Sequence, residues 1–154
     1  MGACEVRRAV VADAAAVHAL RRRAIRESAA GLYPPDALER WADGGSEADV
    51  RRQIETTAGF VAASGDRVVG WANLDGDEVG QLYVDPDHGG KGTARRLYEA
   101  IEALAVARQI RTLTATASLR SIPVFGRFGF TAVLTEDRIY DGLPYRVADM
   151  VKAL

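Results

Sequence analysis

The chain has 154 residues, which is enough for one domain with a sizeable core but too few for two independent ones. Apolar residues make up 48% and charged residues 27%, values that exclude a disordered or fibrous protein. A formal net charge of -1 gives no electrostatic reason to expect DNA or an anionic membrane as a partner.

The N-terminal end contains the only cysteine, Cys4, so no disulfide can form within the chain and no second thiol is available for a metal. Residues 1–10 lack the apolar core of a signal peptide, and no apolar run approaches the roughly 20 residues of a membrane span. We therefore expect a cytoplasmic protein with no metal and no membrane partner.

The first elements are a strand and a helix. Residues 5–11 predict a short strand, after which Asp13 is placed to cap a helix that ends near Gly31. Its apolar residues recur at helical spacing and share one face: Val17, Leu20 and Ala24.

Two shorter helices are expected next. Pro34 and Pro35 are typical of a helix start, and the pair Gly44-Gly45 of its end. Ser46, with an acidic residue three positions later, predicts a capping box for a further helix that runs through Ile54.

Three strands then follow closely, at residues 60–63, 68–74 and 79–85. The turns between them contain Gly65 and Gly76 beside aspartates, and such pairs favour tight hairpins because glycine tolerates a positive φ. An antiparallel meander is predicted. Gly80 inside the third strand marks a possible β-bulge.

A glycine-rich segment joins the third strand to a helix. Residues 89–94 read Gly-Gly-Lys-Gly-Thr-Ala, and the apolar residues that follow recur every three to four positions. The first amides of a helix have no intrahelical acceptor and carry the positive end of its dipole, while glycines let the backbone approach a ligand closely. We therefore expect a diphosphate to bind here, with Lys91 and Arg95 at the rim.

The last quarter of the chain predicts a strand at 112–116, a short helix within 118–128, and closing strands at about 131–135 and 145–151. No repeat, low-complexity tract or linker divides the sequence. One domain over residues 1–154 is expected.

Two common nucleotide-binding motifs do not fit the glycine-rich segment. A Walker loop needs Gly-Lys followed directly by Ser or Thr, but Gly92 separates Lys91 from Thr93. A dinucleotide fingerprint needs a third glycine within a parallel βαβ unit, and this segment has neither.

The sequence instead resembles the GCN5-related N-acetyltransferase (GNAT) superfamily. Residues 92–94 (Gly-Thr-Ala) fit the G-x-G/A part of its acetyl-CoA signature, residues 82–86 are similar to its fourth strand, and Phe128-Gly129-Phe130 to the end of its second conserved segment. The resemblance spans nearly the whole chain. It implies an α+β (α/β three-layer) fold: a mixed, mostly antiparallel sheet of six to seven strands flanked by helices and splayed at the acetyl-CoA strand.

The loop and the resemblance together predict acetyl-CoA as co-substrate. The expected contacts are Leu82, Tyr83, Val84, Gly89, Gly90, Lys91, Gly92, Thr93, Ala94, Arg95, Ser118 and Phe125.

Three of these residues depart from the family pattern. Gly89 stands where Gln or Arg is usual, and Ser118 where Asn is frequent. Phe125 replaces the tyrosine with which many members protonate the leaving thiolate, so the usual general acid is missing.

In the implied reaction an amine attacks the thioester, so the amine must be neutral when it attacks. Glu78, at the start of the third strand of the meander, is the candidate base, directly or through water. Strand alternation places Glu78, Leu82 and Val84 on one face unless a bulge intervenes. Tyr140 and Tyr145 could reach the sulfur, but neither is assigned a role.

Tyr33 and Trp41 are the candidate substrate-binding residues, because the early helices commonly form one wall of the acceptor cleft in this family. A purely structural role, in which both residues pack the short helices against the sheet, is equally compatible with the sequence. The expected acceptor is a primary amine of a small molecule or peptide. An acyl-CoA-binding sensor with little catalysis is the alternative, and the resemblance also implies that a homodimer can form through C-terminal strands.

Overall fold

The computed structural model describes residues 4–140 and 142–154. Over these residues, seven strands form one sheet in the order β1-β2-β3-β4-β5-β7-β6. The strands are β1 (Glu5–Arg8), β2 (Ala58–Ser64), β3 (Arg67–Asp75), β4 (Glu78–Val84), β5 (Thr112–Ser118), β6 (Thr131–Tyr140) and β7 (Leu143–Ala153). Neighbours pair antiparallel except β4 and β5, which are parallel. The predicted α+β fold with a mixed, mostly antiparallel sheet is therefore confirmed.

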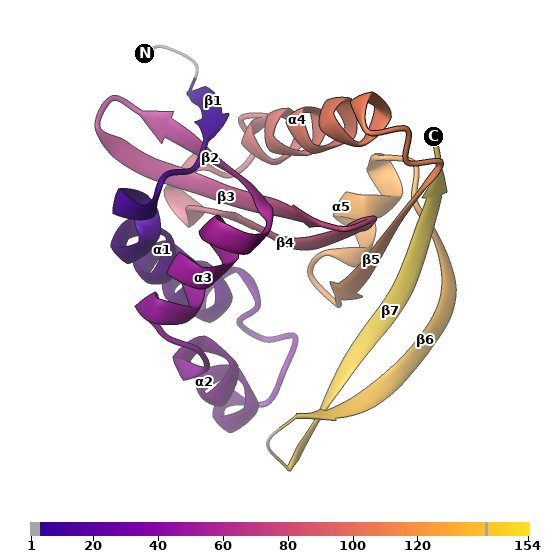
Figure 1. The fold of residues 1–154 in the computed structure, drawn as a ribbon. Helices are drawn as coiled ribbons and strands as arrows, with labels where there is room; N and C mark the ends of the chain where they lie inside the picture. Colours follow the sequence, from indigo (N-terminus) through magenta and orange to yellow (C-terminus); the bar gives the residue numbers. More distant parts are fainter. Residues whose placement is uncertain (1–3, 141) are drawn as a thin grey trace.

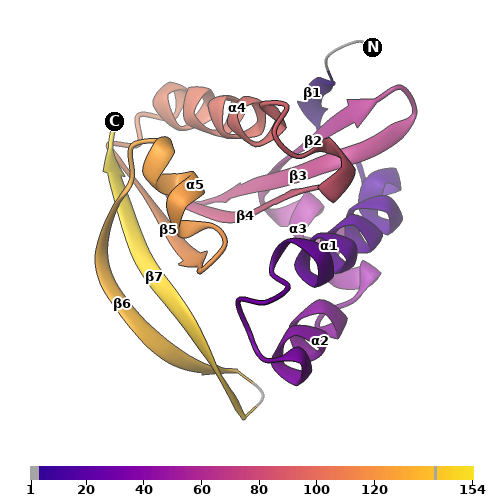
Figure 2. The same cartoon turned by 180° about the vertical axis from the view of Figure 1, so that it is seen from behind.

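Helices cover both faces of the sheet (Figure 1). They are α1 (Ala14–Ser28), α2 (Pro35–Asp43), α3 (Glu47–Thr56), α4 (Thr93–Ala107) and α5 (Ile122–Arg127), with single 3-10 turns at Val11–Asp13 and Pro86–His88. Helices α1 to α3 lie on one face of the β1–β4 part, and α4 lies on the other (Figures 1 and 2). Three layers result, as predicted.

Apolar side chains explain the position of α4. Leu97 and Ile101 are fully buried and belong to one cluster with Val69 and Leu74 of β3 and Val79 of β4. Gly70 permits the close approach, because a Cβ there would lie 2.7 Å from Leu97 Cδ1. The helix that begins at the glycine-rich segment is thus fixed against the sheet.

The face beneath α1 has its own core. Trp71 of β3 is fully buried with Val61, Val17 and Leu20, and its indole N–H donates to Gln81 Oε1 at 2.9 Å. Alternate residues of β4 therefore serve the two faces, with Leu82 toward α4 and Tyr83 toward α1.

The predicted role of Asp13 as cap of α1 is wrong. Its carboxylate instead accepts two hydrogen bonds of 2.9 Å from Arg7 and one of 2.8 Å from the Val10 amide. The Arg7 guanidinium lowers the pKa of Asp13, against partial burial that raises it. Ser46 does cap α3, accepting from the Asp49 amide at 3.2 Å.

The C-terminal hairpin is longer than predicted. Strand β6 extends to Tyr140 and β7 begins at Leu143, whereas the sequence predicted strands only at about 131–135 and 145–151. Most of β6 is exposed at the sheet edge, so its sequence lacks the regular apolar and polar alternation of a half-buried strand. The helix predicted within 118–128 is confined to Ile122–Arg127.

Candidate functional site

Strands β4 and β5 separate almost as soon as they meet. Only Glu78 with Thr114 and Val79 with Ala115 pair across them, and the strands then diverge (Figure 2). The predicted splay is therefore present. The backbone of residues 80–84 is left without a strand partner on this side.

A bulge lies at the point of divergence. Val79 pairs with Leu74 and Gln81 with Asn73, so Gly80 is the extra residue of β4. The predicted bulge at Gly80 is confirmed. It reverses the alternation of side chains, and Glu78 therefore does not share a face with Leu82 and Val84. A Cβ on residue 80 would lie 2.9 Å from Asn73 Oδ1, which explains why glycine fits here.

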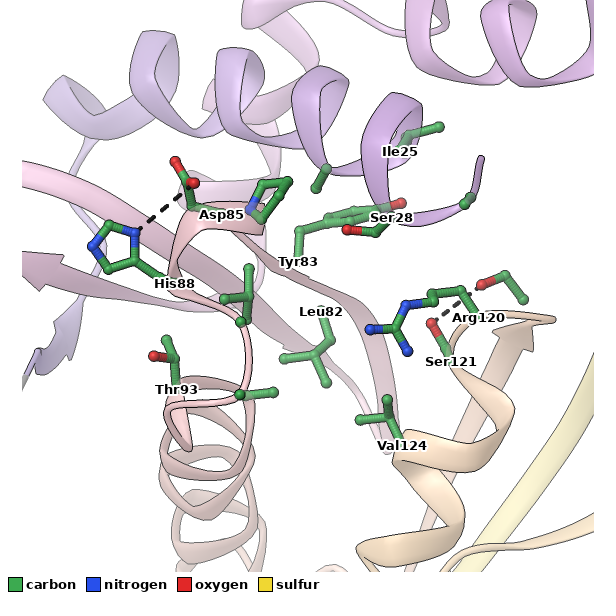
Figure 3. Close-up of a pocket in the computed structure, with 18 of the residues that line it drawn as sticks. Ile25, Ser28, Leu82, Tyr83, Asp85, His88, Thr93, Arg120, Ser121 and Val124 are labelled. Atoms are coloured by element: carbon green, nitrogen blue, oxygen red, sulfur yellow. Dashed lines mark hydrogen bonds and ion pairs between the residues drawn. The ribbon is translucent and has the colours of Figure 1, made fainter. Parts of the chain in front are cut away.

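A groove of about 450 Å³ runs from this gap to the start of α4 (Figure 3). Leu82, Tyr83 and Val84 form its floor, and the glycine-rich segment forms one end. Of the twelve expected cofactor contacts, ten line the groove; the other two are Lys91 and Phe125. Phe125 lines a small adjoining cavity between β4 and α5.

The backbone at the start of α4 is arranged for an anion. Gly92 adopts φ 79°, a left-handed conformation that favours glycine, and directs the chain into the helix. Among the described residues, no backbone carbonyl accepts a hydrogen bond from the amides of residues 90–95. These donors and the helix dipole together make a site for phosphate oxygens.

The segment before the glycines is held by a buried carboxylate. Asp85 is 3% exposed and accepts from Arg67 at 2.8 Å, from Arg23 of α1 at 3.1 Å and from the Asp87 amide at 2.9 Å. Arg23 also donates to Asp87 at 2.8 Å and lowers the pKa of that exposed carboxyl group. His88 Nδ1 lies 3.9 Å from Asp85 (Figure 3). The loop therefore keeps its position relative to α1 through charge pairs.

Basic side chains flank the groove on the α5 side. Arg95 lies 5.2 Å above the Phe128 ring and 3.4 Å from the Arg127 carbonyl. Arg120 extends toward Leu82 from the turn before α5, beside Ser121 (Figure 3). Sequence reasoning missed Arg120, Ser121 and Arg127. Their only signal was proximity to Ser118, since their position depends on how α5 packs.

The α1 side of the groove was missed too. Ile25 and Ser28 line it from the last turn of α1, opposite α5 (Figure 3). Both lie at helical spacing on one face of α1, and such spacing predicts a buried face but does not predict contact with a ligand.

Glu78 lies outside the groove, at the foot of β4. The pKa of Glu78 is raised, first by partial burial of the carboxyl group and then by the charges of Asp75, Asp77 and Asp149. A carboxyl group with a raised pKa is a better proton acceptor near neutral pH than an ordinary glutamate.

The two candidate substrate residues lie together. Tyr33 and Trp41 make an edge-to-face contact with ring centroids 5.5 Å apart, and Trp41 lines both the groove and an adjacent cavity. The Tyr33 hydroxyl donates to the Arg146 carbonyl at 2.9 Å and accepts from the Leu119 amide at 3.0 Å. Tyr33 is thus a structural link to β7 that also presents its ring to the cavity.

No group of three or more His, Cys, Asp or Glu side chains is placed to hold a metal within residues 4–140 and 142–154. In the same part of the chain, no helix has both the length and the apolar character needed to cross a membrane.

Residues 29–154 match a family profile described as an acetyltransferase (GNAT) domain. No curated protein matches the sequence significantly.

Solved structures give close matches over the full length. A GCN5-related N-acetyltransferase from Rhodopseudomonas palustris is 29% identical with a TM-score of 0.94, over 100% of this chain and 98% of that one. PaiA N-acetyltransferase from Thermoplasma acidophilum, a coenzyme A complex, is 17% identical with a TM-score of 0.78 over 100% of both chains. YncA from Salmonella typhimurium, a putative acetyltransferase with acetyl-CoA, is 21% identical with a TM-score of 0.74, over 99% of this chain and 94% of that one.

Proposed function

Because the chain belongs to the GNAT acetyltransferase family, we propose that it transfers an acetyl group from acetyl-CoA to a primary amine of a small molecule or peptide. The observation that carries the proposal is the groove, which joins unpaired amides at the start of α4 to the gap between β4 and β5. We take residues 1–154 as a single acetyltransferase domain.

The groove fits a nucleotide thioester in both charge and shape. Amides of residues 90–95 donate to the diphosphate, and Arg95 and Arg120 add positive charge near it. The Leu82–Val84 backbone, without a partner strand, can pair with the amides of the pantetheine arm. The bound thioester supplies an activated acetyl group, and Ser118 and Phe125 lie on the α5 side of its path.

Glu78 acts as the proton acceptor for the amine, directly or through water. The bulge at Gly80 supports this role, because it turns Glu78 away from the side occupied by Leu82 and toward the face that carries α1 to α3. Backbone N–H groups freed near Gly80 are available to stabilise the negative charge that develops on the carbonyl oxygen.

The leaving thiolate departs without a dedicated acid. Phe125 is 4% exposed and has no proton to donate. A thiol with a pKa near 8.5 is an adequate leaving group without protonation. Tyr145 does not fill the role, since its hydroxyl is buried and donates to the Ala37 carbonyl at 2.6 Å.

The chain acts in the cytoplasm and forms a homodimer through β6, without nucleic acid as a partner. The cytoplasmic assignment rests on the single thiol, Cys4. The dimer rests on the exposed edge strand β6, where Val133, Leu134 and Ile139 are 61%, 48% and 67% exposed.

The test combines binding and turnover. Calorimetry measures the affinity of the protein for CoA and acetyl-CoA. A thiol reagent measures the release of CoA in the presence of a panel of amines. Acceptor-dependent release is expected. Tight binding of CoA without release from any amine would instead support the acyl-CoA sensor, which the missing hydroxyl at Phe125 favours. Native protein that binds neither form would refute both functions.

A further inference from the structure

A polar cavity of about 490 Å³ lies beside the bulge of β4, on the face of the sheet that carries α1 to α3 (Figure 1). Its wall comes from α1, α3 and the hairpin of β3 and β4. Gly80 and Gln81 line both this polar cavity and the small cavity between β4 and α5. The bulge turns Glu78 toward the same face. An occupant of the polar cavity therefore adjoins the place where acetyl transfer is proposed.

One buried amide oxygen at this cavity accepts no hydrogen bond. Asn73 is 3% exposed, and its Nδ2 donates to Thr57 Oγ1 at 3.1 Å. The Thr57 hydroxyl gives its own proton to the Gln53 carbonyl at 2.6 Å, so toward Asn73 it can only accept. The amide oxygen of Asn73 is thereby directed to Gly80, where it has no partner among the described residues. Such an acceptor is destabilising until a donor reaches it.

Neighbouring polar groups of the cavity do not supply that donor. Gln53 Oε1 is a second buried acceptor without a partner in the described part of the chain. The Ser46 hydroxyl donates to the Asp49 carboxylate at 2.9 Å, and the Thr56 hydroxyl donates to the Arg52 carbonyl at 2.7 Å. Hydroxyl protons at the wall are thus used within the protein, and two amide oxygens remain for a ligand.

Charges of both signs line the cavity. Arg52 pairs with Asp49 at 3.2 Å, and Arg21 donates to the Gly44 carbonyl at 2.8 Å. Asp75, opposite Glu78 in the hairpin, is a second carboxylate at the wall. The free amide oxygens therefore select a hydrogen-bond donor, whether that donor is neutral or cationic.

We propose that this cavity binds a second hydrogen-bond donor of the acceptor, a hydroxyl or ammonium group that a short carbon chain links to the reacting amine. This inference rests on the proposed acetyltransferase function. The reacting amine lies at the gap between β4 and β5 and gives its proton to Glu78, while the second group donates to the amide oxygens of Asn73 and Gln53. Asn73 and Gln53 determine specificity and take no part in the chemical step.

The experiment compares butylamine, propanolamine and diaminopropane, which have the same length and differ at one end in a methyl, hydroxyl or ammonium group. Acetyl-CoA-dependent CoA release gives kcat/KM, referred to the free-base concentration of each amine because their basicities differ. We expect propanolamine and diaminopropane to exceed butylamine by about fivefold, the value of one hydrogen bond. Longer homologues of all three amines test the reach from the gap to the cavity.

Gln53→Met gives the sharpest variant, because it removes a free oxygen and keeps the length of the side chain. The preference for propanolamine over butylamine should fall about fivefold, while the melting temperature stays the same or rises because no bond within the protein is lost. Asn73→Leu should also abolish the preference, with a lower melting temperature through loss of the bond to Thr57. Glu55→Met is the matched control, since Glu55 is an exposed residue of α3 that does not line the cavity.

The outcomes separate this inference from the acetyltransferase function. Turnover of butylamine as fast as that of the two other amines, at every chain length, would overturn the inference and leave the function standing. An unchanged preference in Gln53→Met and Asn73→Leu would also refute the cavity as the donor site. If no amine is acetylated, the function fails, and calorimetry with the CoA-saturated protein still decides: tighter binding of propanolamine than of butylamine supports the cavity, and equal binding overturns it.

Discussion

At the scale of single residues, Glu78 has a carboxyl group that holds its proton more tightly than usual. Partial burial contributes most to the raised pKa, and the neighbouring carboxylates of Asp75, Asp77 and Asp149 add to it. A proton acceptor of this kind is inactive while protonated. Activity therefore depends on pH through this group.

We predict that the acidic limb of the kcat/KM profile lies above pH 4.5, the ordinary glutamate value. Asp75→Asn should move that limb to lower pH, because it removes one of the charges that raise the pKa of Glu78. Glu78→Gln should lower the rate about 100-fold near neutral pH while CoA affinity stays the same. Unchanged kinetics of Glu78→Gln would eliminate Glu78 as the base.

The raised pKa of Glu78 also makes the stability of the fold depend on pH. Because its pKa is raised in the folded state, Glu78 favours folding at pH values below its unfolded pKa, and this contribution is lost as pH rises through the folded pKa. At neutral pH the charged form is then less favourable in the folded than in the unfolded chain. Thermal unfolding of Glu78→Gln should accordingly occur at slightly higher temperature than that of the parent.

Residues predicted from local backbone chemistry lie at the groove, and their contact with a cofactor stays a prediction. Gly90, Gly92 and Thr93 follow from a glycine loop at a helix start, and ten of the twelve residues expected to bind the cofactor line the groove. Arg120 and Ile25 could not be predicted in this way. Their places in the groove depend on the packing of α5 and α1, which periodicity does not specify.

At the scale of elements, the glycine-rich segment contains two left-handed residues, Gly90 with φ 72° and Gly92 at the start of α4. Gly92 has φ 79° and Gly65 has φ 60°, and a Cβ on either would meet no atom within 4 Å. Alanine at either position would therefore destabilise the protein through backbone strain and not through a steric clash.

Gly92→Ala and Gly65→Ala should each lower the free energy of unfolding by about 1 kcal/mol, measured by urea denaturation. Only Gly92→Ala is expected to weaken CoA binding, by about tenfold in calorimetry, because it redirects the amides that open α4. Gly65 lies in the hairpin between β2 and β3, outside the groove, and serves as the matched control. Equal CoA affinity in both variants would contradict the role of these amides.

Two positions show which local features the sequence could predict and which it could not. The bulge at Gly80 could be predicted because a glycine weakens a strand interior and is typical of a bulge or of a close backbone approach. Asp13 was misassigned because its oxygens can serve a helix start or a guanidinium, and Arg7 on the neighbouring strand decides between them. Such competition between partners is tertiary, and the local sequence does not record it.

At the scale of the whole molecule, the fold class followed from the family resemblance rather than from periodicity. The turns at Gly65 and Gly76 identified the meander β2-β3-β4, but no local pattern indicates that β7 lies between β5 and β6. The outer strand β6 then presents an unpaired edge with exposed apolar side chains.

We expect sedimentation to give the mass of a dimer, because pairing through β6 would satisfy this edge. Val133→Lys combined with Leu134→Lys should yield a monomer, by placing like charges at the contact. A surface control is Val106→Lys in α4, which is 58% exposed and lies in a different part of the molecule. A monomeric parent protein would remove β6 as an interface.

The separation of β4 from β5 also affects how the sheet resists an applied force. Two residue pairs join these strands, whereas seven join β5 to β7. Beyond these two pairs, side chains rather than backbone groups connect the two parts of the structure, as in the stacking of Tyr98 on Phe128 with ring centroids 4.7 Å apart. A force applied across the sheet would therefore separate β4 from β5 first. An acetyl donor bound along this gap would resist that separation.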